Sequence, residues 1–254
     1  MSREITLHGK KLLVTGAASG MGRAFARLAS AQGAQLALFD RNASGLEAVR
    51  SELAAAGPVV AHAVDLVEWP AVEESVNASV ASMGGVDALV NIAGWDEPGR
   101  FWEQSLEMWH KLIDVNLWSN LHMTRAALPY LMEQQRGAIV SVSSDAGRVG
   151  SKGETVYAAA KGGIIALTKS LAREMAPYQV RVNCVCPGPV RTALLEQEMK
   201  DNPTLIEKLI KAVPLRRVGE PDDVAPMLAF LASDESSYIT GQVISVSGGL
   251  TMVG

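Results

Sequence analysis

Lys11-Leu-Leu-Val-Thr15-Gly16-Ala-Ala-Ser-Gly20-Met-Gly22 is the stretch of this 254-residue chain that decides the fold. It begins as a short apolar run typical of a buried strand and passes, through three glycines, into a segment typical of a helix. Gly16 permits a tight turn, Gly20 allows the backbone to approach a phosphate, and Gly22 allows close helix packing. Because a helix N-terminus favours anions, the stretch predicts a dinucleotide-binding turn. Its spacing is G-x-x-x-G-x-G rather than the commoner G-x-G-x-x-G, and a purely structural turn is the alternative.

The same alternation continues along the chain. Short runs rich in Val, Ile and Leu predict strands buried on both faces, and longer amphipathic segments between them predict helices. The predicted strands are Lys11–Thr15, Gln35–Asp40, Val59–Asp65, Ala88–Ile92, Ala138–Ser143, Val180–Val185 and Val243–Val246. The predicted helices are Met21–Gln32, Ala43–Ala56, Ala71–Met83, roughly Leu106–Glu133, Val156–Met175 and Leu194–Ala212.

This alternation predicts an α/β fold, with right-handed crossovers and a doubly wound parallel sheet of seven strands that carries helices on both faces. No linker or repeat interrupts it, so one Rossmann-type domain is expected over residues 1–254. The alternation breaks between Cys186 and Val243, where a Pro-Gly-Pro turn precedes several helical segments. We expect a substrate lid at about residues 189–215.

Composition excludes several classes of protein. Hydrophobic residues make up 48% of the chain and charged residues 20%, which argues against disorder. The net charge of −4 argues against a nucleic-acid or anionic-membrane binder. No signal peptide and no apolar run of roughly 18 residues is present, so a soluble cytoplasmic protein is expected. Cys184 and Cys186 are expected to be buried free thiols, and the four histidines show no ligand spacing, so no metal site is expected.

Acidic and amide residues stand where predicted strands end. Asp40 lies 24 residues after Gly16, where a carboxylate can accept hydrogen bonds from ribose hydroxyls and repel a 2′-phosphate. Asp40 therefore favours NAD over NADP; capping of the next helix is the alternative, and Arg41 leaves some use of NADP open. Asp65 and Asn91 end the third and fourth strands, where contact with adenine, packing against the cofactor or structural capping would each explain them.

Three polar residues point to a catalytic site. Tyr157 and Lys161 are four residues apart in an Ala/Gly-rich helical stretch, so both lie on one helix face. Ser144 follows a predicted strand, and the loop of residues 145–154 can fold it back towards the tyrosine. Such a Tyr/Lys pair is often no more than a solvated helix face, but the small residues around it leave room for a ligand against the backbone.

Over essentially its full length the chain resembles the short-chain dehydrogenase/reductase family. The matching pieces are Thr15-Gly-Ala-Ala-Ser-Gly-Met-Gly22, Asn91-Ile-Ala-Gly94, Asn116 in Asp-Val-Asn-Leu, Ser144, Tyr157-Ala-Ala-Ala-Lys161, Pro187-Gly188 and Thr192. Ile92 departs from the family, which usually has a second Asn there, and Arg216 stands where Gly is commoner.

The resemblance implies the roles of individual residues. Ser144 would bind the substrate oxygen, Tyr157 would donate or accept the proton, and Lys161 would lower the pKa of Tyr157 and hold the nicotinamide ribose. Asn116 would anchor a water that relays protons, and Thr192 with the backbone near Val190 would grip the carboxamide. The cofactor would lie against Gly16, Ser19, Gly20, Met21, Gly22, Asp40, Arg41, Asp65, Leu66, Asn91, Ala93, Gly94, Tyr157, Lys161, Pro187, Gly188, Val190 and Thr192.

The expected substrate is a secondary alcohol or ketone. Gly94-Trp95-Asp96, the block Ser144–Tyr157 and Ser247-Gly-Gly-Leu-Thr-Met resemble the 2-hydroxycyclohexanecarboxyl-CoA dehydrogenase subgroup. That resemblance implies a cyclic or hydrophobic β-hydroxyacyl thioester, possible contacts from Ser144, Trp95, Arg148 and Leu194, and a homotetramer. Arg148, Lys152 or Arg216 would meet coenzyme A phosphates, unless these are merely solvated cations.

Three other functions are alternatives. A 3-oxoacyl-thioester reductase generally prefers NADPH, and Asp40 argues against it. An extended-branch lyase or epimerase is disfavoured by the short C-terminal region. A non-catalytic nucleotide-binding regulator would normally have lost Tyr157 or Lys161, and both are present.

Overall fold

Seven parallel strands form the centre of the protein, in a computed structural model that describes residues 6–55, 57–192, 195–196, 200 and 204–253. The strands are β1 (Lys11–Thr15), β2 (Gln35–Asp40), β3 (Val59–Ala63), β4 (Ala88–Asn91), β5 (Gly137–Val142), β6 (Val180–Pro187) and β7 (Val243–Val246). Their order in the sheet is β3-β2-β1-β4-β5-β6-β7, and every neighbouring pair is parallel. The strand order therefore reverses at β1, beside β4, which is where open α/β sheets bind ligands.

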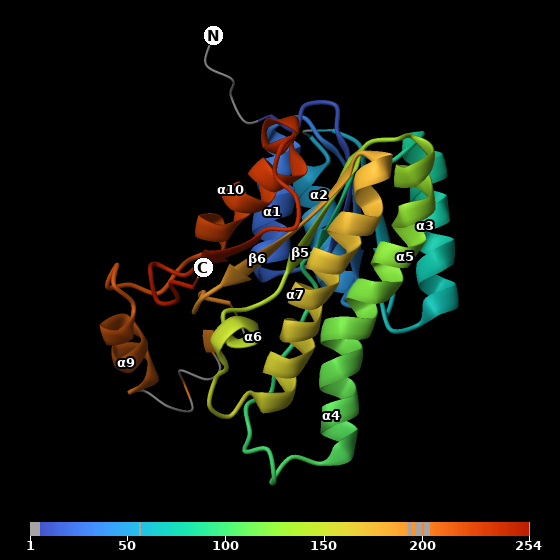
Figure 1. The fold of residues 1–254 in the computed structure, drawn as a ribbon. Helices are drawn as coiled ribbons and strands as arrows, with labels where there is room; N and C mark the ends of the chain where they lie inside the picture. The colour runs from blue at the N-terminus through green and yellow to red at the C-terminus, as the bar shows by residue number, and fades with distance from the viewer. Residues whose placement is uncertain (1–5, 56, 193–194, 197–199, 201–203, 254) are drawn as a thin grey trace.

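Helices cover both faces of this sheet (Figure 1). The helices on one face are α1 (Gly20–Ala31), α2 (Ala43–Leu53) and α10 (Pro221–Ala232). Those on the other are α3 (Trp69–Met83), α5 (Ser119–Glu133) and α7 (Thr155–Met175). The remaining described α-helices are α4 (Leu106–Ile113), α6 (Ala146–Val149) and α9 (Leu205–Ala212). The fold predicted from the sequence, a doubly wound seven-stranded sheet, is confirmed.

The apolar runs have the burial expected of central strands. Leu12 and Val14 of β1 pack into the core on the side of α1, whereas Leu13 between them packs into the core on the side of α3. Successive side chains of a strand point to opposite faces, so a strand covered on both faces needs an unbroken apolar run. Each fully buried side chain of this size stabilises the fold by roughly 1.5–3 kcal/mol.

Several boundaries differ from those predicted. The helix expected over Leu106–Glu133 is divided into α4, a π-helical segment Asp114–Trp118, and α5. Residues 145–154 are not only a loop, because they contain the one-turn helix α6. β3 ends at Ala63, two residues early, because the carboxylate of Asp65 accepts a hydrogen bond from the backbone N–H of Val67 and turns the chain.

The late excursion is only partly described. α9 covers the second half of the helix predicted at Leu194–Ala212, and residues 193–194, 197–199 and 201–203 lie outside the described part. The lid expected at 189–215 therefore stays a prediction. α10 begins with a reciprocal cap, in which Asp223 accepts a hydrogen bond from the backbone of Glu220.

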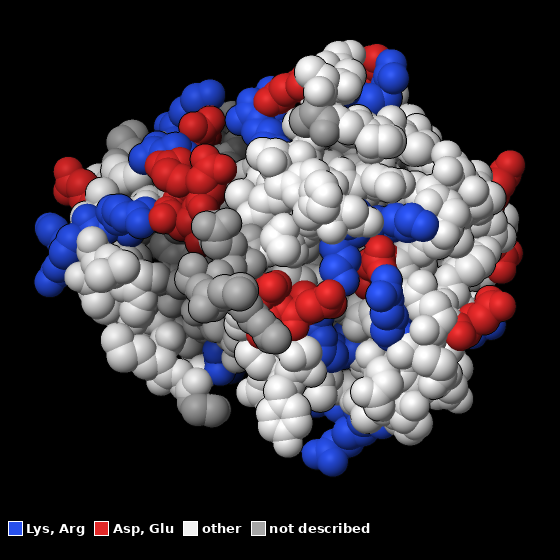
Figure 2. Space-filling model, turned by 90° about the horizontal axis from the view of Figure 1, so that it is seen from above, with Lys and Arg blue, Asp and Glu red and all other residues white. Residues whose placement is uncertain are grey.

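Cys184 and Cys186 are buried free thiols of β6, as predicted. Among the described helices, none has both the length and the apolar character that a membrane crossing requires. Figure 2 views the molecule from above and shows acidic and basic side chains lying beside one another on that face.

Candidate active site

The glycine turn between β1 and α1 packs against the end of β4. Gly16 has a φ of 66°, in the left-handed region that favours glycine. A Cβ atom at Gly16 would lie 2.9 Å from the backbone nitrogen of Ala93, and one at Gly22 would lie 2.0 Å from the carbonyl oxygen of Gly16. The hydroxyl of Thr15 accepts hydrogen bonds from the N–H groups of Ile92 and Ala93, at 2.9 and 3.1 Å. The turn therefore needs Gly16 for its tight bend and Gly22 for close helix packing, as predicted, and the approach of the backbone at Gly20 to a pyrophosphate stays a prediction.

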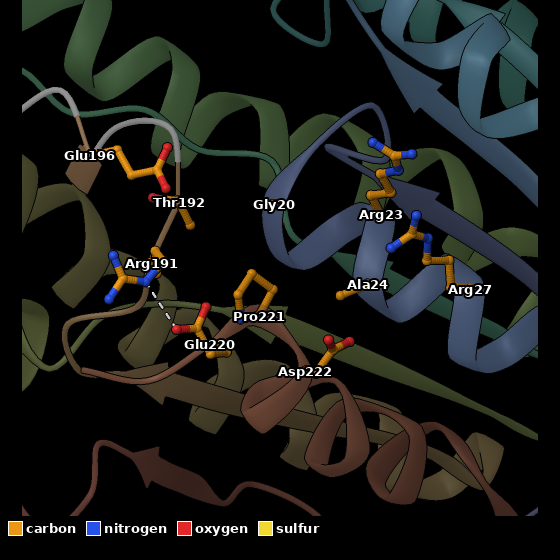
Figure 3. Close-up of a pocket in the computed structure, with 10 residues that line it drawn as sticks. All are labelled: Gly20, Arg23, Ala24, Arg27, Arg191, Thr192, Glu196, Glu220, Pro221 and Asp222. Carbon is orange, nitrogen blue, oxygen red and sulfur yellow. Dashed lines mark hydrogen bonds and ion pairs between the residues drawn. The ribbon is translucent and has the colours of Figure 1, made fainter. Parts of the chain in front are cut away.

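A cavity of about 340 Å³ opens beside this turn (Figure 3). Gly20 lies on one side and Thr192, from the segment after β6, on the other; a Cβ at Gly20 would be 3.5 Å from Cγ2 of Thr192. Ser19 stands at the N-cap of α1, but its side chain makes no capping bond. Met21 is half-buried against the core. The structure thus brings the late segment and the glycine turn together, although they are far apart in the sequence.

Asp40 turns back towards the glycine turn. Its Oδ2 accepts a hydrogen bond from the N–H of Ala18 at 3.0 Å, and its Oδ1 accepts one from the N–H of Asn42 at 2.9 Å. Asn42, not Asp40, caps α2, since its side chain accepts from the N–H of Gly45. The alternative explanation of Asp40 as a helix cap is therefore wrong.

A second cavity, of about 480 Å³, lies beyond β2 and β3 at the same edge of the sheet. The predicted residues Arg41 and Asp65 line it, together with polar residues of α4 that include His110 and Lys111. The side chain of Asp65 also accepts a hydrogen bond from the N–H of Val67, which supports the structural explanation of this residue. The volume of the cavity lies within the range of small-molecule sites, about 300–1,000 Å³, and Arg41 on its wall directly follows Asp40.

Leu66 and Asn91 are buried rather than open to a cavity. Leu66 belongs to the core, and its carbonyl contacts Nδ1 of His122 at 3.0 Å. Nδ2 of Asn91 donates to the hydroxyl of Thr124 at 3.2 Å, which ties β4 to α5. This contact supports the structural explanation of Asn91, and its packing against the cofactor stays a prediction.

Asn116 lies on the π-helical segment and fixes the chain after β4. Its Oδ1 accepts a hydrogen bond from the N–H of Trp95 at 3.1 Å. Its Nδ2 donates to the carbonyl oxygens of Trp95, at 2.6 Å, and Leu112, at 2.9 Å. A Cβ at Gly94 would lie 2.9 Å from Nζ of Lys161 and 3.0 Å from Oδ1 of Asn116. The absence of a side chain at Gly94 is what allows these two residues to approach the backbone.

Ser144, Tyr157 and Lys161 meet at the carboxyl end of β5. Ser144 hydrogen-bonds Tyr157 and also accepts from the N–H of Ala146 at 3.1 Å. Lys161 is 2% exposed; its Nζ donates to the carbonyl of Val142 at 3.1 Å and lies 5.6 Å from the ring centre of Tyr157. The loop does fold Ser144 back to the tyrosine, as the sequence predicted.

Burial sets the proton affinities of this pair. It raises the pKa of Tyr157 well above 10, and the charge of Asp96 raises it further, whereas the hydrogen bond to Ser144 lowers it. Burial lowers the pKa of Lys161 from 10.5 to about 8. Burial of the phenol dominates in this structure, and the lowering of the pKa of Tyr157 by Lys161 together with an oxidised nicotinamide stays a prediction.

The loop after β6 closes the other side of the site. Pro187 ends β6, and its carbonyl accepts a hydrogen bond from the N–H of Asp145, next to Ser144. Gly188 is packed so tightly that a Cβ there would lie 2.8 Å from Cβ of Ser247. Val190 is buried and pairs with Gly219. These contacts hold the late loop beside the catalytic residues.

The candidate substrate residues have different outcomes. Trp95 is half-buried, with Nζ of Lys111 3.8 Å from its ring centre. Arg148 points away, because its guanidinium donates to the carbonyls of Val243 and Val253 and to the hydroxyl of Ser245. Those contacts assign it to the last strand and the C-terminal segment rather than to a phosphate. Leu194 lies outside the described residues.

Three residues at the site were not singled out as site residues from the sequence. Thr15 joins β1 to the end of β4, and the charges of Asp96 and Glu154 both act on Tyr157. Asp96 directly follows Gly94-Trp95, and Glu154 directly precedes α7, the helix that carries Tyr157. Their positions next to predicted site residues could have indicated that they lie near the site. Nothing in the sequence alone indicates that the charges of both carboxylates raise the pKa of the tyrosine.

Comparison with known proteins agrees with this geometry. Residues 16–251 match the family model described as Enoyl-(Acyl carrier protein) reductase. The chain is 38% identical over 247 residues to the 3-oxoacyl-[acyl-carrier-protein] reductase FabG of Thermotoga maritima, which covers 97% of this chain and 99% of that protein. It is 38% identical over 251 residues to the 2,3-dihydroxy-2,3-dihydro-p-cumate dehydrogenase of Pseudomonas putida. That match covers 98% of this chain and 97% of the Pseudomonas putida protein.

A solved structure of a short-chain dehydrogenase/reductase from Brucella melitensis superimposes with a TM-score of 0.91 at 34% identity, over 97% of this chain and 98% of that one. The chain belongs to the short-chain dehydrogenase/reductase family. It is accordingly an NAD(P)-dependent oxidoreductase that acts on alcohol or keto groups.

Proposed function

We propose that this protein is an NAD(H)-dependent dehydrogenase of secondary alcohols in which Tyr157 is the acid/base. The observation that carries the proposal is the contact of Ser144 with Tyr157 above the buried Lys161, at the edge of the sheet where the glycine turn lies. The nicotinamide, when bound, accepts or supplies the hydride. The rest of the chemistry belongs to the residues of this chain.

Proton transfer is the task of Tyr157. The hydroxyl of Ser144 would hold the substrate oxygen beside the phenol, and Tyr157 would take the proton of an alcohol or return it to a ketone. Because burial raises the pKa of Tyr157, the phenolate needs additional positive charge, and Lys161 with an oxidised nicotinamide would provide it. Lys161 would also hold the ribose. Asn116 is bonded to Trp95 and Leu112, so in this structure it fixes the loop over the site; a bound water relay is a further role that we propose for it.

Asp40 supports NAD over NADP. The backbone bonds to Ala18 and Asn42 hold the carboxylate beside the glycine turn, where it would accept hydrogen bonds from ribose hydroxyls and repel a 2′-phosphate. Arg41, on the wall of the larger cavity, is the residue that would favour NADP instead.

For the substrate, we propose a cyclic or hydrophobic β-hydroxyacyl group carried as a thioester. Support comes from the resemblance of the segments around Trp95 and Tyr157 to enzymes of that kind, and from an acyl-group reductase among the relatives. The second candidate is NADPH-dependent reduction of a 3-oxoacyl thioester, which the Thermotoga maritima relative favours.

A fluorescence titration of the purified protein with NADH and NADPH tests the proposed cofactor. We expect NADH to bind at least tenfold more tightly, since the carboxylate of Asp40 disfavours a second anion nearby. Tighter binding of NADPH would mean that Arg41 outweighs Asp40 and would put the reductase in first place. Turnover of a panel of thioesters and free alcohols then tests the substrate, and equal rates for both would contradict the thioester.

A further inference from the structure

Hydrogen bonds between side chains join the turn that carries Ser144 to the last strand of the sheet. The hydroxyl of Ser245, in β7, donates to Oδ1 of Asp145, the residue that directly follows Ser144. The same hydroxyl accepts a hydrogen bond from the guanidinium of Arg148 at 2.9 Å. Asp145 precedes the one-turn helix α6 and Arg148 lies within it, so α6 is bound to β7 through a single serine.

Arg148 extends this connection to the segment after β7. Its guanidinium also donates to the carbonyl oxygens of Val243, at 3.3 Å, and Val253, at 2.9 Å. The side chain is half-buried, although arginine is mostly exposed in proteins. Because a guanidinium carries five donors in a fixed plane, it can bond several acceptors at once. One side chain of α6 is thus fixed by β7 and by the segment that follows β7.

Asp145 depends on this arrangement because its carboxyl group is buried. The residue is 5% exposed, and its Oδ2 atom has no hydrogen-bond partner among the residues that the structure describes. A buried carboxylate needs hydrogen bonds or an opposite charge to compensate its removal from water. Ser245 provides the hydrogen bond to Oδ1, and the cation that shares this hydroxyl is Arg148. Loss of Arg148 would therefore draw Asp145 towards water, away from its place beside Ser144.

On its other side, α6 packs tightly against the helix that carries the catalytic pair. A Cβ at Gly147 would lie 2.8 Å from the backbone nitrogen of Gly162 and 2.9 Å from Cβ of Lys161. At the start of α6, the N–H of Ala146 donates to the hydroxyl of Ser144 at 3.1 Å. The turn therefore lies between α7 and β7, and the contacts on the β7 side bear on the position of the Ser144 hydroxyl.

We propose that Arg148 is a positioning residue, which holds the turn of Ser144 in place through Ser245. Its effect passes from Ser245 to Asp145, and from Asp145 to the neighbouring Ser144. The inference rests on the proposed function, in which Ser144 holds the substrate oxygen beside Tyr157. Misplacement of a positioning group by about 1 Å can cost on the order of a hundredfold in rate, so a change on the β7 side of α6 would reach the chemistry.

Arg181 offers a matched control at the opposite end of β6. It is also half-buried, and its guanidinium donates to two carbonyl oxygens, those of Leu231 and Ser233, and to the hydroxyl of Ser236. It has the same kinds of partner as Arg148, but it is the second residue of β6, far along the strand from the carboxyl end where the site lies. Arg181→Gln should therefore cost stability as Arg148→Gln does, and only Arg148→Gln should alter the reaction.

The first test measures kcat and KM for the oxidation of methyl 2-hydroxycyclohexanecarboxylate by NAD. We expect Arg148→Gln to lower kcat about tenfold to a hundredfold and to change the KM for NAD by less than about twofold, since the glycine turn is untouched. Ser245→Ala should lower kcat by a smaller factor. Arg181→Gln should leave kcat within about twofold of wild type. A kcat that Arg148→Gln lowers no more than Arg181→Gln does would overturn the inference.

A double-variant cycle tests whether Arg148 acts through Ser144. If it does, Arg148→Gln should lower kcat by less than about twofold once Ser144→Ala is already present, because the group that Arg148 positions is gone. A purely structural role would not depend on Ser144. Losses that multiply in the double variant would therefore contradict the proposed role.

Hydrogen exchange separates this inference from the proposed function, because it needs no turnover. Mass spectrometry of a peptide spanning residues 144–150 should show exchange at least about tenfold faster in Arg148→Gln and in Ser245→Ala, and unchanged exchange in Arg181→Gln. If Arg148→Gln fails to fold, Ser245→Ala, which removes one hydroxyl, is used in both tests. Faster exchange without oxidation of any alcohol would support the hold of Arg148 on the turn and contradict the proposed function alone. Exchange as slow as in wild type would overturn the inference.

Discussion

Lys161 carries a cost to stability that its place in the site explains. Its amino group is almost completely buried, and burial lowers its pKa from 10.5 to about 8. The unfolded chain therefore binds more protons than the folded one between about pH 8 and pH 10.5. The contribution of Lys161 to the free energy of unfolding therefore rises with pH across that window. Below about pH 8 its destabilising effect is at its full size. A buried lysine with a lowered pKa is a feature of functional sites.

The variant Lys161→Met should therefore be inactive and yet more stable than wild type near pH 7. The gain is at most about 3 kcal/mol, from 2.5 pKa units at 1.36 kcal/mol each, and loss of the bond to Val142 would reduce it. Urea unfolding of both proteins between pH 7 and pH 10 measures the difference. It should shrink as pH rises; a difference that is constant with pH would show that Lys161 titrates as an ordinary lysine.

Asp40 makes the choice of cofactor testable at one residue. In Asp40→Asn the side-chain oxygen can still accept from the N–H of Ala18, so the glycine turn should keep its shape. The charge is lost, and the preference for NADH over NADPH should fall about tenfold. The ratio of the two dissociation constants is the measurement, with Glu68→Gln as control because Glu68 is an exposed residue on the wall of the neighbouring cavity. If Asp40→Asn left the ratio of the NADH and NADPH dissociation constants unchanged, Asp40 would not be the residue that selects NAD.

At the scale of elements, the contact between β1 and α1 depends on Gly22. A Cβ there would lie 2.0 Å from the carbonyl oxygen of Gly16 and 3.1 Å from Cα of Ala17, and these are backbone atoms that cannot move aside easily. Gly22→Ala should destabilise the protein by about 2–3 kcal/mol and weaken NADH binding. Gly162→Ala is the control: its Cβ would lie 3.5 Å from the carbonyl oxygen of Gly147, an ordinary contact on a helix. Thermal unfolding should separate the two, and equal losses would contradict the packing argument.

Sequence predicted the elements better than their ends. β1, β2 and β7 were placed correctly because their apolar runs stop at turn residues or at Asp40. The π-helical segment Asp114–Trp118 could not be predicted, since an extra residue in a turn leaves the apolar pattern almost unchanged. Such segments often mark functional sites, and here the segment carries Asn116.

The candidate site divides in the same way. The glycine turn and the group of Ser144, Tyr157 and Lys161 follow local patterns, so spacing was enough to find them. The path of the backbone next to Asp96 depends on bonds between Asn116 and Trp95, which are 21 residues apart, and the orientation of Arg148 depends on contacts with the last strand. Arg216 shows what a family pattern can add: it has a φ of 57°, in the region that favours glycine, where the family commonly has glycine.

At the scale of the whole molecule, large apolar side chains remain on the surface. Trp118 is 48% exposed, and every residue of the edge strand β7 is only half-buried. We propose that these regions are covered in a homotetramer. Light scattering should give a mass about four times the 26.9 kDa of the chain, and Trp118→Glu should lower it. A wild-type protein that stays monomeric at micromolar concentration would contradict this.

The most direct test of the central claim is to measure, in one preparation, NAD-dependent alcohol oxidation and NADH binding by Tyr157→Phe. The phenyl ring keeps the shape of the site and removes only the hydroxyl that contacts Ser144. The account predicts that turnover falls by about 10²–10⁴-fold while the NADH dissociation constant changes less than threefold. Turnover within tenfold of wild type would contradict the assignment of Tyr157 as the acid/base.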